Sequence, residues 1–200
     1  QRARATHWAC AVSAPTADYL AQALASRGVQ FSLETGVTAF TGSDGRVDGV
    51  LTSRSENVAA DLVVVGVGVE PNVELARAAG LPVQDGIVVD PHLRTSDPGS
   101  WASGDCARYP ATYCAAPVRL ESVQNAVDRA RCVAARIVGK PEPYAKVPWF
   151  WSDQGDNRLQ IAGVAETGDS AVLRGDPAAG KFSVFRFRDG RLSAVESINS

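Results

Sequence analysis

The sequence predicts an α/β fold: the later part of a doubly wound parallel-sheet region, followed by a smaller α+β region with an antiparallel sheet. Three observations predict this fold. Residues 61–67 form a continuous β-branched apolar run, which is typical of a strand buried on both faces of a parallel sheet. Residues 121–138 form a long Ala/Val-rich helical pattern, with Gly139 past its end. After residue 158, short strands alternate with Gly-Asp and Asp-Gly turns, which indicates an antiparallel sheet.

In the first section, residues 1–68, the apolar positions predict one helix and several strands. Residues 16–27 show helical spacing and stop at Gly28, a suitable helix cap. A strand should follow at 29–33. The segments 37–40 and 47–51 flank Gly-Ser-Asp-Gly, which indicates an antiparallel hairpin.

The second section, residues 69–144, should contain two helices and two short strands. Asn72 is a suitable N-cap for a helix over 73–79 that Gly80 ends. The remaining predicted elements are strands at 86–90 and 101–103, the helix at 121–138 and a stiff linker at 140–144. The third section, residues 145–200, should hold strands at 159–164, 171–173, 182–187 and 192–197.

Composition limits the possible functions. The chain has 200 residues, 45% of them hydrophobic, and a net charge of −2, which suits one good core or two modest ones. No apolar run approaches the ~20 residues of a membrane span, and no concentrated basic run points to nucleic acid. The cysteines show neither CxxC pairing nor metal-ligand spacing, which favours reduced thiols and a cytoplasmic location; they are Cys10, Cys106, Cys114 and Cys132.

The most informative motif is Ser103-Gly104-Asp105-Cys106, a carboxylate on a glycine turn directly after a short apolar strand. Gly104 permits a tight turn beside a ligand. Asp105 would then point into a strand-end crevice, where α/β folds bind nucleotides, and could bond a sugar hydroxyl. A surface Gly-Asp turn remains an alternative interpretation of the same four residues.

Two further segments have alternative readings. Glu121 and Ser122 should lie in the first turn of the long helix, either as caps or as neighbours of a cofactor at the positive helix end. The aromatic run Trp149-Phe150-Trp151 is either a core plug or, at Trp151, part of a cofactor pocket.

Four segments in order resemble the pyridine-nucleotide-dependent flavoprotein reductases, and the Trp-x-Trp-Ser-Asp-Gln element narrows the resemblance to the ferredoxin reductases, such as putidaredoxin and rubredoxin reductase-like enzymes. The segments are the Val-Gly-Val-Gly-Val-Glu-Pro run at 65–71, the Gly-Asp motif at 104–105, Arg-Leu-Glu-Ser-Val-Gln-Asn-Ala at 119–126 and Trp-Ser-Asp-Gln at 151–154. The resemblance matches only the later part of such a reductase, so we expect a C-terminal fragment. It lacks the Gly-x-Gly-x-x-Gly turns that bind FAD and NAD(P) pyrophosphates.

The resemblance implies the remainder of doubly wound FAD- and NAD(P)-binding domains plus a truncated C-terminal reductase domain. It makes 1–68 part of the NAD(P) domain, 69–144 the second FAD-domain segment and 145–200 an interface domain. Gly66 and Gly68 would allow close approach to the cofactor, although a plain strand-to-helix connection explains them equally well.

The resemblance also implies roles for individual residues. Asp105 would bond a ribityl hydroxyl, the backbone of Cys106 would face the flavin, and the backbone at Val123 would meet the pyrimidine edge of the flavin ring. Glu121 and Trp151 would border the nicotinamide pocket.

The implied activity is transfer of electrons from NADH through FAD to a ferredoxin-type iron–sulfur protein, which would feed an oxygenase or cytochrome P450. The choice between NADH and NADPH stays open. One alternative is a disulfide reductase of the same superfamily, which needs a redox cysteine pair or a C-terminal His-Glu dyad. The other is a cofactor-free module that serves packing or oligomerisation.

Overall fold

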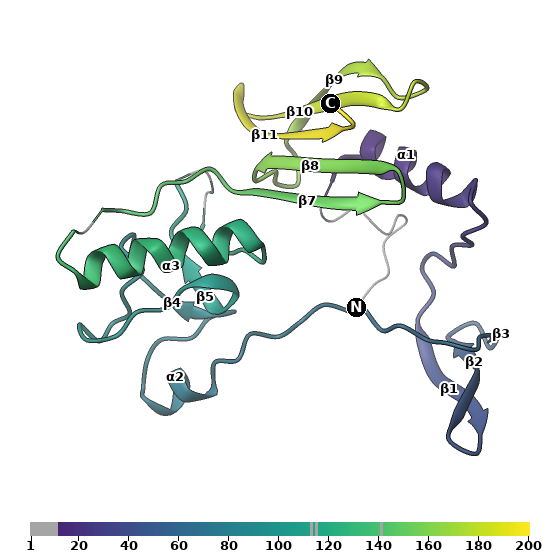
Figure 1. Cartoon of the computed structure of the whole chain (residues 1–200), viewed down its shortest axis with the longest axis horizontal. Coiled ribbons are helices and arrows are strands. Elements are labelled where there is room, and N and C mark those ends of the chain that lie inside the picture. Colours follow the sequence, from purple (N-terminus) through teal and green to yellow (C-terminus); the bar gives the residue numbers. More distant parts are fainter. Residues whose placement is uncertain (1–11, 113, 115, 141) are drawn as a thin grey trace. The chain divides into compact units, whose positions relative to one another are not determined.

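The computed structural model describes residues 12–112, 114, 116–140 and 142–200 (Figure 1). Cys10 lies outside the described residues. The chain divides into two compact units, residues 1–69 and 70–200. Among the residues that the structure describes, no helix has the length and apolar character needed to cross a membrane.

The first unit contains the predicted helix as α1, Ala14–Ala25, two residues earlier than the pattern indicated. Pro15 lies in the first turn, where its missing N–H costs no hydrogen bond. The buried face includes Ala17 and Leu20, both fully buried. Gly28 has a φ of +90°, and its N–H bonds to the carbonyl of Ala25, so a glycine follows the helix end as predicted.

The predicted hairpin is confirmed as β1, Val37–Ser43, and β2, Arg46–Thr52, which pair antiparallel. Asp44 and Gly45 between them have φ values of +51° and +74°, the left-handed conformations that a tight hairpin turn requires. A third strand not predicted from the sequence, β3, Asn57–Ala59, pairs with β2.

Two predicted strands of this unit are wrong. Residues 29–33 and 61–67 pair with no other strand among the described residues. The apolar side chains of the second segment are largely exposed, with Val64 at 85% and Leu62 at 80%. A strand of a parallel sheet exists only by pairing with neighbours that are distant in sequence, and the described part of this unit supplies none.

The second unit begins with α2, Glu74–Ala78. Its N-cap is Val73, without a side-chain hydrogen bond, so the prediction that Asn72 caps this helix is wrong. A helix of barely one turn gains little from a cap, and Val73 directs the chain into it with a φ of −126°. Gly80 follows the helix with a φ of +74°, as predicted.

This unit contains a small three-stranded sheet and one long helix (Figure 1). The sheet has the order β4-β5-β6, with β4, Ile87–Val88, parallel to β5, Ala107–Tyr109, and β6, Val118–Arg119, antiparallel to β5. A single 3₁₀ turn, η1, Gly104–Cys106, leads into β5. The long helix is α3, Val123–Ile137, and Gly139 past its end has a φ of +79°.

The strand predicted at 101–103 is wrong. Trp101 makes only an isolated bridge with Arg94, and Ala102 is buried without a regular ladder. The predicted linker is also partly wrong, because Tyr144 is buried. Its ring lies edge-on to Tyr109 at 5.6 Å between centroids.

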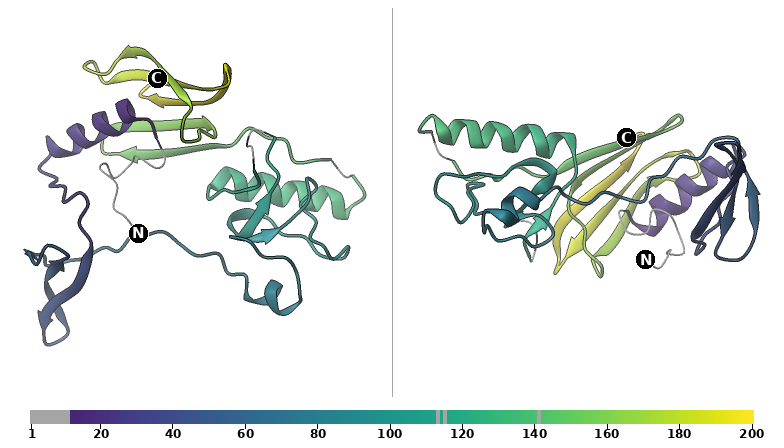
Figure 2. Two further views of the ribbon diagram at one scale, coloured as in Figure 1. Left: turned by 180° about the vertical axis from the view of Figure 1, so that it is seen from behind. Right: turned by 90° about the horizontal axis from the view of Figure 1, so that it is seen from below.

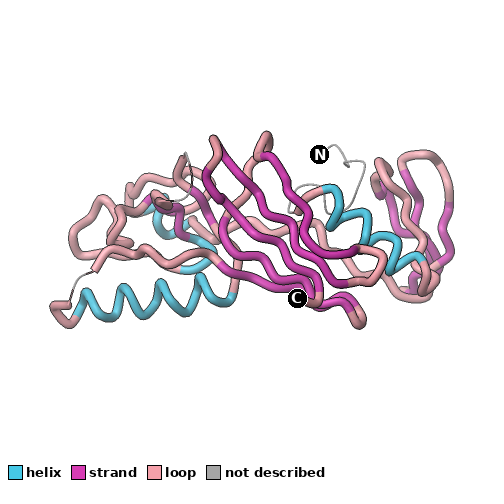
Figure 3. The backbone as a smooth tube through the Cα atoms, turned by 90° about the horizontal axis from the view of Figure 1, so that it is seen from above, coloured by secondary structure: helices cyan, strands magenta, loops and turns pink. Residues whose placement is uncertain are grey.

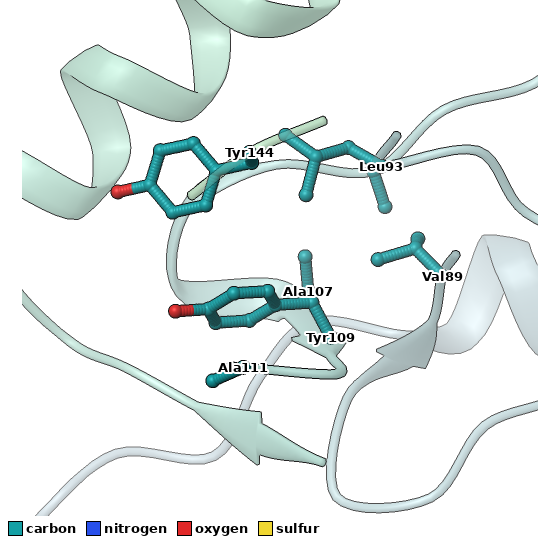
Figure 4. Packing of buried hydrophobic residues seen from close by; sticks show 7 residues of the cluster. Val89, Leu93, Ala107, Tyr109, Ala111 and Tyr144 are labelled. Carbon is teal, nitrogen blue, oxygen red and sulfur yellow. The ribbon is translucent and has the colours of Figure 1, made fainter. Parts of the chain in front are cut away.

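One buried apolar cluster of this unit gathers around that tyrosine pair (Figure 4). It also contains Val89, Leu93, Ala102, Ala107 and Ala111. The guanidinium of Arg129, from α3, lies 3.5 Å from the ring centre of Tyr109. Removal from water lowers the pKa of Arg129.

The last section is a five-stranded antiparallel sheet in the order β7-β8-β11-β10-β9. Figure 3 shows the strands side by side, and Figure 2 shows the sheet from two further sides. The strands are β7, Trp149–Gln154; β8, Asn157–Gly163; β9, Ser170–Asp176; β10, Lys181–Arg188; and β11, Arg191–Ile198. The predicted antiparallel sheet is therefore confirmed. The aromatic run forms edge strand β7, in which Trp149 and Phe150 are partly buried and Trp151 is exposed.

Candidate functional site

The Asp105 turn lies against the first turns of α3. Gly104 has a φ of +73°, a conformation that favours glycine. A Cβ at this position would lie 3.8 Å from Ala126 of α3, an ordinary contact, so backbone conformation and not space requires the glycine. The side chain of Asp105 is exposed, and its carboxylate makes no hydrogen bond or ion pair with any described residue. The carboxylate is therefore a free hydrogen-bond acceptor.

The N-terminus of α3 is capped by Ser122, whose Oγ accepts a hydrogen bond from the Asn125 N–H at 3.1 Å. The capping interpretation of Ser122 is therefore confirmed. The N–H groups of Val123 and Gln124 have no intrahelical partner, because the first residues of a helix lack a preceding turn. The side chain of Val123 is 63% exposed. Two free donors and an apolar side chain thus meet at the positive end of a 15-residue helix.

Glu121 lies outside α3, one residue before the cap, so its predicted place in the first helical turn is wrong. A serine in extended conformation at the cap moves the preceding residue out of the helix. Instead of capping, the Glu121 carboxylate pairs with the Nη1 of Arg119. Arg119 belongs to the 119–126 motif, but the sequence analysis assigns it no role.

Gln124 connects the helix to the tryptophans of β7. Its Oε1 accepts a hydrogen bond from the backbone N–H of Trp149 at 2.9 Å. The rings of Trp149 and Trp151 stack at 4.9 Å with an interplanar angle of 26°. Trp151 is 39% exposed, so one part of its ring is available to a ligand. The sequence analysis also assigns no role to Gln124. The available signal is its place in the first turn of the predicted helix, directly after Glu-Ser-Val.

The other candidates lie as follows. The Sγ of Cys106 donates to the carbonyl of Ser103 at 3.4 Å, so the sulfur is turned to its own backbone. Gly66 and Gly68 belong to the first unit, in a segment that pairs with no strand among the described residues. Gly68 has a φ of +93°, which favours glycine. Cys106 and the remaining six candidates all belong to the second unit, residues 70–200.

These groups fit one kind of ligand. A free carboxylate accepts hydrogen bonds from hydroxyl groups, and free N–H groups at a helix start donate to carbonyl oxygens or ring nitrogens. An exposed tryptophan and valine contact a flat ring. The combination suits a heteroaromatic ring with a polar edge and a hydroxylated chain, and the flavin of FAD has both. The fold is therefore of the α/β class, and the candidate site offers groups suited to a flavin.

Comparison with known proteins identifies the family. Residues 4–130 match the model described as pyridine nucleotide-disulphide oxidoreductase, and residues 149–200 match the reductase C-terminal model. The first match covers more than half of the chain. The chain therefore belongs to the pyridine nucleotide-disulphide oxidoreductase family, in agreement with the resemblance noted from its motifs.

Three similar proteins are ferredoxin reductases or relatives of them. Rhodocoxin reductase of Rhodococcus erythropolis is 50% identical over 94% of this chain and 44% of its own length. The ferredoxin reductase for the CYP199A2 system from Rhodopseudomonas palustris superposes with a TM-score of 0.93, at 45% identity over 98% of this chain and 48% of that one. The reductase of the covalent putidaredoxin reductase–putidaredoxin complex gives 0.92, at 39% identity over 98% and 47%. This chain thus spans less than half the length of these relatives.

Proposed function

We propose that the complete protein containing this chain is a flavoprotein oxidoreductase. It passes electrons from NADH through FAD to a ferredoxin-type iron–sulfur protein that feeds an oxygenase or a cytochrome P450. The observation that carries this proposal is the free Asp105 carboxylate beside the open first turn of α3, with Trp151 held near that turn through Gln124. The identity to rhodocoxin reductase and to the CYP199A2-system reductase supports the electron acceptor class.

In this proposal the second unit holds the flavin. Asp105 accepts a hydrogen bond from a ribityl hydroxyl, and the N–H of Val123 donates to the pyrimidine edge of the ring. Ser122 keeps these donors in place by capping the helix. The backbone at Cys106 faces the ring, and Gly66 and Gly68 leave room for close approach of the cofactor.

Glu121 and Trp151 border the nicotinamide side of the pocket. FAD, when bound, supplies acceptance of a hydride from NAD(P)H and release of electrons one at a time. The residues of this chain bind and orient the flavin and the nicotinamide. None of the proposed site side chains needs to act as acid or base, because a hydride transfer moves no proton to or from the protein.

We further propose a cytoplasmic location and the division into 1–68, 69–144 and 145–200. The three described cysteines, Cys106, Cys114 and Cys132, are free thiols, which suits a reducing compartment. Burial raises the pKa of both the Cys114 and the Cys132 thiol, so neither is an activated thiolate. This observation gives no support to the disulfide-reductase alternative from the described part of the chain.

Flavin affinity tests the proposal. The protein should be expressed from its complete reading frame, stripped of flavin and titrated with FAD. Asp105→Ala should raise the FAD dissociation constant by roughly 5- to 150-fold, the effect of losing about 1 to 3 kcal/mol at one hydrogen bond. Asp97→Ala is a matched control, because Asp97 is also exposed but bonds locally to Ser100. It should leave FAD affinity unchanged.

The same preparation should reduce putidaredoxin or another ferredoxin in an NADH-dependent manner. Protein from the complete frame that binds no FAD contradicts the proposed function and favours the cofactor-free module. FAD binding with equal affinity in the wild type and Asp105→Ala would show that Asp105 is a surface turn residue.

A further inference from the structure

We propose that Arg119 is a positioning residue of the flavin site, which fixes both the Asp105 turn and the Glu121 carboxylate. The inference rests on the proposed function for its ligand, and it adds a residue to which neither the fold nor the motifs assign a role. Arg119 itself does not need to touch the cofactor. It acts through two residues that do.

The side chain of Arg119 is 12% exposed and contacts three elements at once. Its Nη1 donates to the backbone carbonyl of Asp105 at 3.2 Å and also pairs with Glu121. Its Nε pairs with the Oδ1 of Asp85 at 3.3 Å. One planar guanidinium therefore joins the turn that carries one candidate site residue to the side chain of the other.

Asp85 anchors this arrangement from the far side of the turn. It has a φ of +47°, and Gly86 follows with +119°. A Cβ on Gly86 would lie 2.9 Å from the carbonyl oxygen of Cys106, so this left-handed turn packs directly against the end of η1. Asp85 also pairs with Arg108 at 3.6 Å. Arg108 and Arg119 lie directly opposite each other in the β5–β6 ladder, and Asp85 offsets the repulsion between them.

The chemistry of arginine explains why this residue suits the position. Its guanidinium presents five N–H donors in a rigid plane, so it can hold a carbonyl and two carboxylates simultaneously, whereas a lysine ammonium is a single point charge on a flexible stem. Burial disfavours the charge, but hydrogen bonds and attraction to Glu121 and Asp85 outweigh it and raise the pKa of Arg119. The Arg119 guanidinium therefore stays charged throughout the physiological pH range.

Arg108 offers a matched control. It lies across the ladder from Arg119 and shares Asp85, but in the described part of the chain its side chain forms no ion pair with Asp105 or Glu121. If Arg119 only stabilises the small sheet, then Arg119→Met and Arg108→Met should behave alike. If Arg119 positions the site, only Arg119→Met should affect the flavin.

The experiment compares these variants in protein from the complete reading frame. We expect Arg119→Met to raise the FAD dissociation constant by roughly tenfold or more, as for the loss of a charge-assisted hydrogen bond, and to change the visible circular dichroism of bound flavin. Arg108→Met should keep the FAD dissociation constant within about twofold, while both variants lower the melting temperature of the apoprotein similarly. Arg119→Lys, which keeps the charge and the fold, should restore only part of the affinity.

Three outcomes would overturn the inference. They are an FAD affinity of Arg119→Met equal to that of the wild type, equal losses of affinity in Arg119→Met and Arg108→Met, and full restoration by Arg119→Lys. The Asp105→Ala variant separates this failure from failure of the proposed function. If Asp105→Ala weakens FAD binding and Arg119→Met does not, the proposed flavin site is supported and the positioning role of Arg119 is rejected. If the wild type binds no FAD, both the proposed function and the role of Arg119 are rejected.

Discussion

Gln124 accepts a hydrogen bond from the backbone N–H of Trp149 and so ties the first turn of α3 to the first residue of β7. The Nε2 of the same side chain donates to Asp128 at 2.9 Å and to the Val147 carbonyl at 3.4 Å. One amide thus holds the backbone on both sides of Pro148. The first residue of β7 is therefore held by α3 as well as by the sheet, and Trp151 lies two residues further along the same strand.

The first prediction concerns Trp151. Trp151→Phe should keep an aromatic side chain stacked on Trp149 and lower the free energy of unfolding by less than about 1 kcal/mol, because the tryptophan is 39% exposed. In protein from the complete reading frame it should change the fluorescence of bound flavin and the rate of its reduction by NADH. Stopped-flow absorbance and fluorescence spectroscopy measure both.

Trp149→Phe is the control for this prediction. Trp149 belongs to the same stacked pair but is less exposed, and its backbone is held by Gln124. We expect it to affect stability more than flavin reduction. Normal reduction kinetics and a normal flavin spectrum in Trp151→Phe would assign Trp151 to packing alone.

Local sequence signals predicted much of the fold correctly. The β1–β2 hairpin follows from Asp44-Gly45, because a tight turn with two positive φ values has few alternatives in sequence. The long helix α3 and four strands of the last sheet also follow from short-range periodicity and turn residues. In each case the partner strand lies nearby in the chain, or the apolar pattern extends over many residues.

The two incorrect strand predictions in the first unit involve partners distant in sequence. The runs at 29–33 and 61–67 have strand composition, but composition alone does not supply the neighbouring strands of a parallel sheet. Glu121 was placed in the helix because helix ends are uncertain by one or two residues, and Ser122 takes the cap.

In the candidate site, too, residues with local sequence signals were predictable and residues that depend on distant contacts were not. Asp105 and Ser122 could be found because a glycine turn and a helix cap have local signatures. Arg119 and Gln124 could not be assigned, because their roles depend on contacts with Asp85, 34 residues earlier, and with Trp149, 25 residues later. The spacing of Arg119 and Glu121, two apart on one side of an extended segment, is the one signal that indicates their pairing.

A second prediction concerns the ion pair between Asp169 and Arg188 in the last sheet. The carboxylate is 3% exposed and accepts two hydrogen bonds from Arg188, both at 3.0 Å, and one from Ser193 at 2.7 Å. Asp169→Asn should lower the free energy of unfolding by about 3 kcal/mol, because it leaves a partly buried guanidinium without its main partner. Asp153→Asn, at an exposed pair 3.9 Å from Arg158, should change it by less than about 0.5 kcal/mol. Urea unfolding monitored by circular dichroism gives both values.

The pH dependence of this difference follows from the direction of the pKa shift. Hydrogen bonds from Arg188, the largest cause, hold the pKa of Asp169 far below its ordinary value. The stabilisation is thus complete above the unfolded pKa of about 3.9 and is lost as the pH falls toward the folded pKa. The stability gap between wild type and Asp169→Asn should be constant from pH 7 to about pH 5 and smaller at pH 3. An equal gap at pH 7 and pH 3 would contradict this assignment.

The last prediction is that the 200-residue chain, expressed alone, is purified without flavin. Its sequence contains no Gly-x-Gly-x-x-Gly turn to hold a pyrophosphate at a helix start. The groups that the structure offers, the Asp105 carboxylate and the N–H donors of Val123 and Gln124, contribute about 1 kcal/mol each. Their sum of about 3 kcal/mol is below the ~4–15 kcal/mol that association costs in lost freedom of motion. Absorbance at the flavin maximum after desalting measures retention, with protein from the complete reading frame as the positive control. A flavin spectrum that survives desalting of the 200-residue chain would show that these few contacts suffice, and would locate the main flavin-binding energy in the second unit.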